Sequence, residues 1–236
     1  ATCLVESCGV VGGPQVRNVA TLGGNVAHAL PAGDGTTSLV ALDAEAEIIL
    51  NGEQKWVPLT DLFLGPGESL LDPTPDLLVR FRFKACGRSE GTAFKRIMRP
   101  QGVALPILGC AVWVRLDATG TTFEAARISI APAGPRPGRA QEIEQFLSSK
   151  PASEETIEQA AALAVFDRVI EARRGVSGAL HPELARTLHN RVLALRELGR
   201  IEEARVAVAE VLALRRRILP PQHCDTARTL GLAASL

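Results

Sequence analysis

One stretch near the start of the chain combines residue types suited to binding phosphate. Gly23 and Gly24 stand side by side, Asn25 follows them and Thr21 precedes them. Glycine has no side chain to shield the backbone, and backbone N–H groups at the start of a helical turn bind anions. Thr21 and Asn25 add a hydroxyl and an amide that can hydrogen-bond a polar ligand. The stretch therefore predicts a phosphate-binding turn, although Gly-Gly-Asn by itself is also a common structural turn.

No other group of residues suggests chemistry of its own. The sequence holds no Ser-His-Asp or paired-carboxylate arrangement, so we predict no catalytic residue. The five cysteines are scattered, and although Cys3 and Cys8 are spaced C-x4-C, no second pair follows at iron–sulfur or zinc spacing. We therefore predict no metal ligand, and we interpret the cysteines as reduced thiols of a cytoplasmic protein.

Composition limits the partners that the chain could have. Of its 236 residues 46% are hydrophobic, which is enough for a buried core, and 26 Lys and Arg balance 26 Asp and Glu. A net charge of zero gives no electrostatic reason to expect nucleic acid or an anionic membrane as a partner. No apolar run approaches the roughly 18–20 residues that span a bilayer, and the first residues lack the basic region of a signal peptide.

The elements that must position the glycine-rich turn differ before and after about residue 151. Before it, short β-branched runs alternate with turns. Residues 46–50 and 53–57 flank Asn51-Gly52, a pair typical of a type I′ hairpin turn. Further strands are expected at residues 77–83, 92–98, 111–116 and 123–131, with helical segments around residues 23–31 and 140–148. Residues 4–11 are expected to be the end of a helix or a lead-in segment.

After residue 151 the sequence is helical and contains an internal repeat. The segment HPELARTL at residues 181–188 recurs as HCDTARTL at residues 223–230, an offset of 42 residues, and Val169, Arg173 and Arg174 have counterparts at the same offset. A fixed period in a helical segment indicates an array of helical hairpins. We expect one hairpin with helices at about 184–198 and 202–218 and a turn at Gly199 and Arg200.

A long motif around the glycine pair resembles a family signature. Residues 14–25, PQVRNVATLGGN, closely resemble the pattern Q-[IV]-R-N-x-[AG]-[ST]-[IL]-G-G-N of the FAD-binding subunits of molybdenum hydroxylases, the xanthine dehydrogenase and carbon monoxide dehydrogenase flavoproteins. The next family element is matched by residues 29–34, ALPAGD. The resemblance continues through residues 57–67, 76–78, 93–96 and 126–144, and so covers about two thirds of the chain.

The resemblance implies a cofactor site for FAD. Matching positions make Thr21, Gly23, Gly24 and Asn25 the turn that contacts the diphosphate and ribityl chain. The resemblance further implies contacts from four residues elsewhere: a neighbouring contact from His28, a ribose-end contact from Asp34, packing on the flavin face by Leu78, and a position near the ring for Lys95. Read singly, His28 fits a structural or solvated histidine, Leu78 a core leucine and Lys95 an exposed strand lysine.

The implied function is electron transfer through FAD between iron–sulfur clusters and an acceptor. Implied partners are an iron–sulfur small subunit and a large subunit with the molybdenum cofactor. The implied fold is α+β, with a mainly antiparallel sheet lobe and a small α/β lobe, followed by helical hairpins. We expect a partial central lobe at residues 1–90, a C-terminal lobe at 91–164 and helical hairpins at 165–236. The family's N-terminal lobe, with a second glycine-rich loop, is expected to be missing.

The helical segment resembles tetratricopeptide repeats of the kinesin-light-chain type, most clearly in LRELGRIEEA at residues 195–204. Such repeats bind protein partners. The alternative function is therefore a protein-interaction scaffold whose flavin lobe is vestigial. A third possibility is that these helices only cover an apolar face of the preceding domain, because about one and a half repeats are fewer than the three usually needed for stability.

Overall fold

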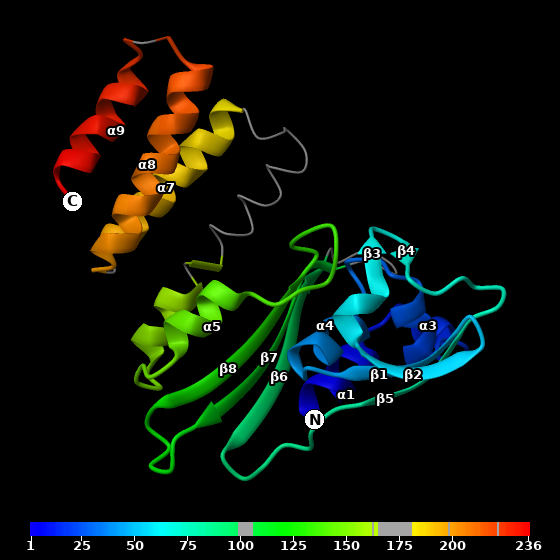
Figure 1. The fold of residues 1–236 in the computed structure, drawn as a ribbon. Coiled ribbons are helices and arrows are strands. Elements are labelled where there is room, and N and C mark those ends of the chain that lie inside the picture. Colours follow the sequence, from blue (N-terminus) through cyan, green and yellow to red (C-terminus); the bar gives the residue numbers. More distant parts are fainter. Residues whose placement is uncertain (99–105, 162, 165–180, 198, 221) are drawn as a thin grey trace. The chain divides into compact units, whose positions relative to one another are not determined.

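The computed structural model describes residues 1–98, 106–161, 163–164, 181–197, 199–220 and 222–236. These form two units, Ala1–Thr156 and Ile157–Leu236, which are described separately (Figure 1). The expected domain limits, 1–90, 91–164 and 165–236, stay a prediction. None of the helices in the described part combines the length and hydropathy needed to cross a membrane.

The first sheet of the larger unit is antiparallel, with the strand order β2-β1-β5. It consists of β1 (Glu45–Leu50), β2 (Glu53–Pro58) and β5 (Leu77–Arg82). Asn51 and Gly52 adopt the positive φ angles, 52° and 84°, that the type I′ turn requires, which confirms the predicted hairpin. One face of the sheet carries Ala46 and Ile48 into a buried core with Leu59, Leu62 and Phe63.

Three short helices pack against this core: α1 (Thr2–Gly9), α3 (Leu22–Ala27) and α4 (Asp34–Ala41). The short helix α2 (Pro14–Arg17) has no buried residue. All eight residues of α4 are buried. Leu39 and Val40 of α4 belong to the core of the first sheet, whereas Ala41 packs with Phe94 and Trp113 of a second sheet. The 3-10 helix η1 (Leu59–Leu62) and the short strands β3 (Phe63–Gly65) and β4 (Glu68–Ser69) lead into the loop before β5.

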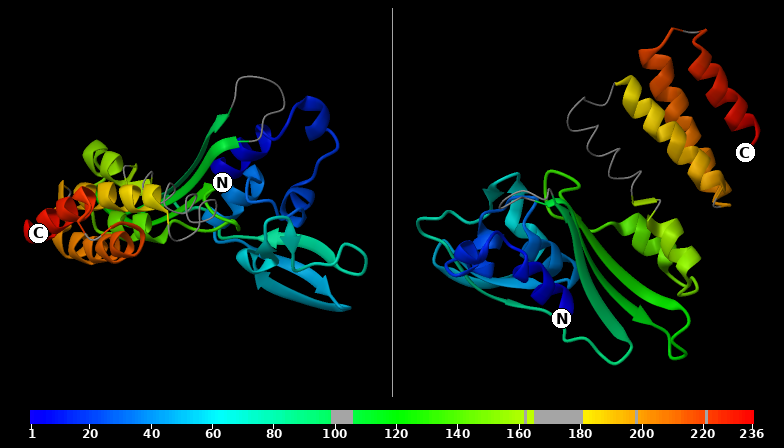
Figure 2. Two further views of the ribbon diagram at one scale, coloured as in Figure 1. Left: turned by 90° about the horizontal axis from the view of Figure 1, so that it is seen from above. Right: turned by 180° about the vertical axis from the view of Figure 1, so that it is seen from behind.

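The second sheet is also antiparallel and has the strand order β6-β7-β8. Its strands are β6 (Glu90–Met98), β7 (Pro106–Leu116) and β8 (Phe123–Ala131), and α5 (Gln141–Leu147) lies along β8 (Figures 1 and 2). The strands and the helix predicted for this region are thereby confirmed. The α+β class predicted from the sequence is also confirmed, because antiparallel sheets and helices are segregated along the chain.

The smaller unit is helical, with α7 (Pro182–Glu197), α8 (Ile201–Ile218) and α9 (Cys224–Ala234). Gly199, at φ 70°, makes the turn between α7 and α8. The apolar stripe of α7 is buried together with small and branched residues of α8: Leu184, Leu188, Val192, Leu195, Ala204, Ala207, Val208 and Val211. The predicted hairpin is confirmed. The repeat positions Val169, Arg173 and Arg174 lie outside the described residues.

Candidate functional site

The glycine-rich turn opens helix α3 and is exposed on one side. Thr21 is the N-cap residue, and its Oγ1 accepts a hydrogen bond of 2.9 Å from the amide of Gly24. The amides of Leu22 and Gly23, in the first turn of α3, have no intrahelical acceptor because the helix begins there. Both amides therefore need an acceptor outside the helix, and the ligand contact expected of this turn stays a prediction.

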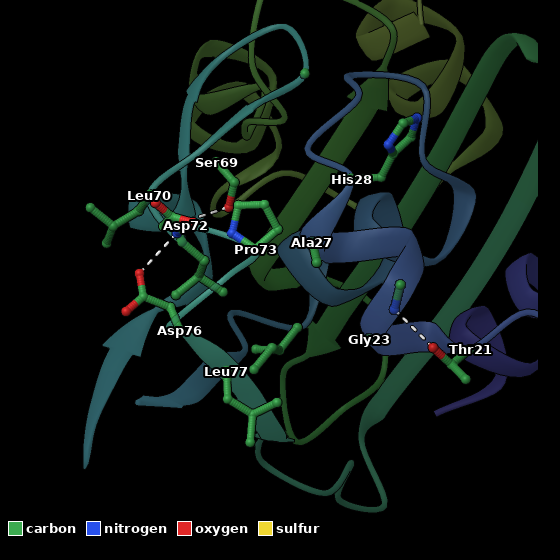
Figure 3. Close-up of a pocket in the computed structure, with 14 residues that line it drawn as sticks. Thr21, Gly23, Ala27, His28, Ser69, Leu70, Asp72, Pro73, Asp76 and Leu77 are labelled. Atoms are coloured by element: carbon green, nitrogen blue, oxygen red, sulfur yellow. Dashed lines mark hydrogen bonds between the residues drawn. The ribbon is translucent and has the colours of Figure 1, made fainter. Parts of the chain in front are cut away.

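An open pocket of about 900 Å³ lies against this turn (Figure 3). Helix α3 forms one wall, the loop from β4 to β5 forms another, and the first residues of β5 form the floor. Five of the eight predicted site residues line it: Thr21, Gly23, Gly24, His28 and Leu78. The tertiary structure therefore brings residues from distant parts of the sequence to one cavity.

No contact inside the protein requires glycine at position 23. A methyl group placed on it would meet nothing closer than Thr21 Oγ1 at 3.8 Å and Leu78 Cδ2 at 3.9 Å, which are ordinary contacts. Both of those residues line the pocket, so the methyl group would stand in the pocket itself. Glycine inside a helix costs about 0.8–1.0 kcal/mol relative to alanine. Neither packing nor a positive φ angle requires glycine at this position. A ligand that must approach the backbone closely would explain why the less stable residue is present.

Asn25 faces away from this pocket and holds two helices together. Its Oδ1 accepts hydrogen bonds from the amide of Thr36 at 3.2 Å and from Thr36 Oγ1 at 3.4 Å, which ties α3 to the first turn of α4. Asn25 also lines a smaller cavity of about 400 Å³ on the other side of α3, together with Thr21 and Gly24. Its amide oxygen therefore has an internal role.

Asp34 and Lys95 do not line the pocket that the described residues form. Asp34 is 5% exposed, and its Oδ2 forms an ion pair of 2.6 Å with Nη1 of Arg96. Burial raises the pKa of the Asp34 carboxyl, and the neighbouring guanidinium of Arg96 opposes that rise. Lys95 is exposed on β6. The ligand contacts expected of both residues stay predictions.

The structure adds pocket residues that sequence reasoning did not select. The end of β4 contributes Ser69, and the loop before β5 contributes Asp72, Pro73 and Asp76. The carboxylate of Asp76 accepts from the amides of Asn51 at 2.9 Å and of Asp72 at 2.8 Å, so the loop is fastened to the β1–β2 turn. Closely spaced prolines and aspartates are typical of a turn, but no local signal in the sequence places this turn opposite α3.

Three family models match the chain. Residues 1–83 match the FAD binding domain in molybdopterin dehydrogenase, and residues 92–195 match the CO dehydrogenase flavoprotein C-terminal domain. Residues 184–225 match a tetratricopeptide repeat, and this range includes most of α7 and all of α8. The two flavoprotein matches together contain every predicted site residue.

Individual relatives agree with these matches. The xanthine dehydrogenase FAD-binding subunit of Escherichia coli O157:H7 is 34% identical over 160 residues, which are 67% of this chain and 53% of that protein. The carbon monoxide dehydrogenase medium chain of Hydrogenophaga pseudoflava is 30% identical over 164 residues, covering 69% of this chain and 55% of that one.

A solved structure of carbon monoxide dehydrogenase from Hydrogenophaga pseudoflava, lacking the Mo-pyranopterin moiety of its cofactor, superposes with a TM-score of 0.61 at 29% identity, over 68% of this chain and 54% of that chain. The chain thus spans about half the length of the curated relatives it matches. Over residues 1–83 and 92–195 the chain belongs to the flavoprotein-subunit family of the molybdenum hydroxylases, whose members include xanthine and carbon monoxide dehydrogenases.

Proposed function

We propose that the chain binds FAD in the pocket beside α3 and serves as an electron-transfer module of a molybdenum hydroxylase-type oxidoreductase. The observation that carries the proposal is the pair of helical glycines at the pocket wall. Gly23 serves no internal contact, and the space that a Cβ there would fill is open. The residues present therefore fit a ligand that must approach a backbone closely, as a dinucleotide diphosphate does.

Each lining residue has a part in binding. The amide of Gly23 would donate to a phosphate oxygen at the start of α3, where the helix dipole also favours negative charge. The hydroxyl of Thr21 accepts from Gly24 and keeps its own proton to donate. Leu78 offers an apolar surface, and His28 offers a ring at the rim. Bound FAD would supply the redox chemistry, and the protein would position it.

The partners follow from the family and are part of the proposal. We infer that an iron–sulfur subunit delivers electrons to this module and that a separate subunit with the molybdenum cofactor carries out substrate hydroxylation. Lys95, Asp34 and Asn25 are retained as proposed members of the wider cofactor site. A cytoplasmic location is part of the same proposal, and the five free thiols of the chain favour it.

A matched pair of glycine variants tests the proposal. Gly23→Ala places a methyl group in the pocket without an internal clash. Gly231→Ala makes the same change in α9 of the helical unit, where the methyl group would have no neighbour within 4 Å. Both should leave thermal stability unchanged or slightly raised, because alanine favours helices. We expect Gly23→Ala to weaken FAD binding at least tenfold in a fluorescence titration of the full chain, and Gly231→Ala to leave the affinity unchanged.

The larger variant Gly24→Leu should abolish binding. A full chain that stays colourless and quenches no FAD fluorescence would refute the proposed function. Binding that is equally tight in Gly23→Ala and in the unaltered chain would remove the α3 turn from the site.

A second candidate function rests on the helical unit. The tetratricopeptide-repeat match and the helical hairpin α7–α8 favour a surface that binds a protein partner. On that hypothesis the flavin lobe is vestigial and the purified chain takes up no FAD. The same titration therefore distinguishes the two functions.

A further inference from the structure

Strand β6 has two adjacent cationic residues, Lys95 and Arg96, whose side chains point to opposite sides of the sheet. Arg96 is the residue after Lys95, and successive side chains of a strand point to opposite sides. The Arg96 side chain is 9% exposed and meets Asp34 at 2.6 Å, whereas Lys95 is exposed. The buried cation of this strand is thus Arg96, a residue that the sequence did not single out.

Arg96 is the counter-ion on which the buried Asp34 depends. The Oδ2 atom of Asp34 accepts a hydrogen bond from Nη1 of Arg96. The Oδ1 atom of Asp34 is buried without a hydrogen-bond partner among the described residues. A carboxylate removed from water with one orphaned oxygen is stable as an ion only while its cation stays in place. Removing Arg96 therefore leaves an uncompensated charge inside the protein.

This ion pair is connected to the pocket through two helices. Asp34 is the first residue of α4, and Thr36, in the same turn, is held by Asn25 of α3 through its amide and hydroxyl. Asn25 directly follows Gly24, whose amide is capped by Thr21 at the pocket wall. Gly35 packs against Leu22 so closely that a Cβ on it would lie 2.6 Å from Leu22 Cδ1. The first turn of α4 thus fixes the place of α3.

We propose that Arg96 is a positioning residue for the cofactor turn: from the second sheet it holds the start of α4, and through Asn25 it holds the glycine turn of α3 in its binding shape. The proposal rests on the proposed FAD site. It extends that site to a residue outside the pocket and connects the region matched by the C-terminal flavoprotein domain to the region matched by the FAD binding domain.

The chain offers a closely matched control for Arg96. Arg80 on β5 also pairs with a buried carboxylate, Glu47, again at 2.6 Å, but the Arg80 side chain is 67% exposed and does not line the pocket. Arg80→Met and Arg96→Met each remove one strand arginine from a buried carboxylate. A general loss of stability should therefore appear in both variants. A loss of FAD affinity through a displaced cofactor turn should appear in Arg96→Met alone.

The experiment is an FAD titration of the full chain and of both variants between pH 5.5 and 8.5, with apo melting curves alongside. We expect Arg80→Met to bind as the unaltered chain does at every pH. Arg96→Met should bind at least tenfold more weakly at pH 8.5 and recover part of that loss at pH 5.5. Recovery is expected because protonation of Asp34 removes the uncompensated charge. Arg96→Lys should restore the affinity to within about threefold.

A second variant covers the case in which Arg96→Met does not fold. Asp34→Asn combined with Arg96→Met leaves no charge at this position. It should therefore melt near the unaltered chain, show an FAD affinity that is the same at pH 5.5 and pH 8.5, and still bind FAD at least fivefold more weakly than the unaltered chain. Binding by this double variant as tight as that of the unaltered chain would overturn the inference, as would equal affinities and pH profiles for Arg96→Met and Arg80→Met. Absence of FAD binding in the unaltered chain would refute the proposed function and this inference with it.

Discussion

At the scale of single residues, glycines in this protein serve two different purposes. Gly23 is open toward the pocket, whereas Gly35 is enclosed by its neighbours. The sequence has glycine at both positions and by itself does not distinguish the two roles. The difference lies in what a side chain would meet, and it leads to opposite expectations for substitution.

Gly35→Ala should destabilise the larger unit. Its methyl group would lie 2.6 Å from Leu22 Cδ1 and 3.1 Å from Asn25 Oδ1, so α3 and α4 would have to move apart. Overpacking of this kind typically costs about 1–3 kcal/mol. Urea unfolding followed by tryptophan fluorescence measures the loss. Gly9→Ala, at a helical position with no neighbour within 4 Å, is the control and should change stability by less than about 0.5 kcal/mol.

At the scale of elements, α5 is attached to the second sheet through one buried carboxylate. Glu144 accepts from the amide of Ile128 on β8 at 2.8 Å and forms an ion pair of 2.6 Å with Arg139. The same contact with Glu144 raises the pKa of the Arg139 guanidinium. The amide of Ile128, on the edge strand β8, is thereby paired.

Glu144→Ala should therefore cost about 2–4 kcal/mol of unfolding free energy, because it leaves a buried amide unpaired and removes the nearer carboxylate partner of Arg139, which keeps only the ion pair of 3.5 Å with Asp43. Glu124→Ala removes an exposed carboxylate that pairs with Arg115 on the same sheet, and it should cost at most about 1 kcal/mol. Urea denaturation compares the two variants. Equal effects would show that α5 does not depend on Glu144.

At the scale of the whole molecule, the two units carry separate spectroscopic signals. Both tryptophans, Trp56 and Trp113, lie in the larger unit, whereas the three long helices form the smaller one. Tryptophan fluorescence therefore follows the larger unit, and the circular dichroism at 222 nm is weighted toward the helical unit. Transitions that do not coincide would show that the units unfold separately.

Acid should weaken the helical unit selectively. Burial lowers the pKa of His189 on α7 below its usual 6.5, and the nearby guanidinium of Arg215 on α8 lowers it further; from α9, Arg228 lowers it and Asp225 opposes the shift. A histidine whose pKa is lowered by folding contributes stability that is present above the unfolded pKa and is lost as the pH falls through it.

We therefore expect the circular dichroism transition to move to lower temperature between pH 7.5 and 5.5, and the fluorescence transition to move less. His189→Gln should remove most of that difference. If the fluorescence transition moves as far as the helical one, the pH dependence does not originate at His189.

The sequence by itself determined the local features and the family. Asn51-Gly52 predicted its hairpin because few residue pairs tolerate two positive φ angles. The 42-residue repeat predicted the α7–α8 hairpin because the apolar residues of the repeat segment recur at helical spacing. The long motif at residues 14–25 indicated the flavoprotein family, which the family matches then showed. It also selected Thr21, Gly23 and Gly24, which line a pocket in the structure.

Only the tertiary structure decided which side chains face which way. It turned Asp34 toward Arg96, left Lys95 exposed and brought Asp72 and Asp76 opposite α3. These outcomes depend on contacts between segments far apart in the chain, for which a motif contains no information. In a strand, adjacent side chains point to opposite faces of the sheet. A motif that locates a cation only to within one residue therefore cannot distinguish a buried counter-ion from an exposed cation.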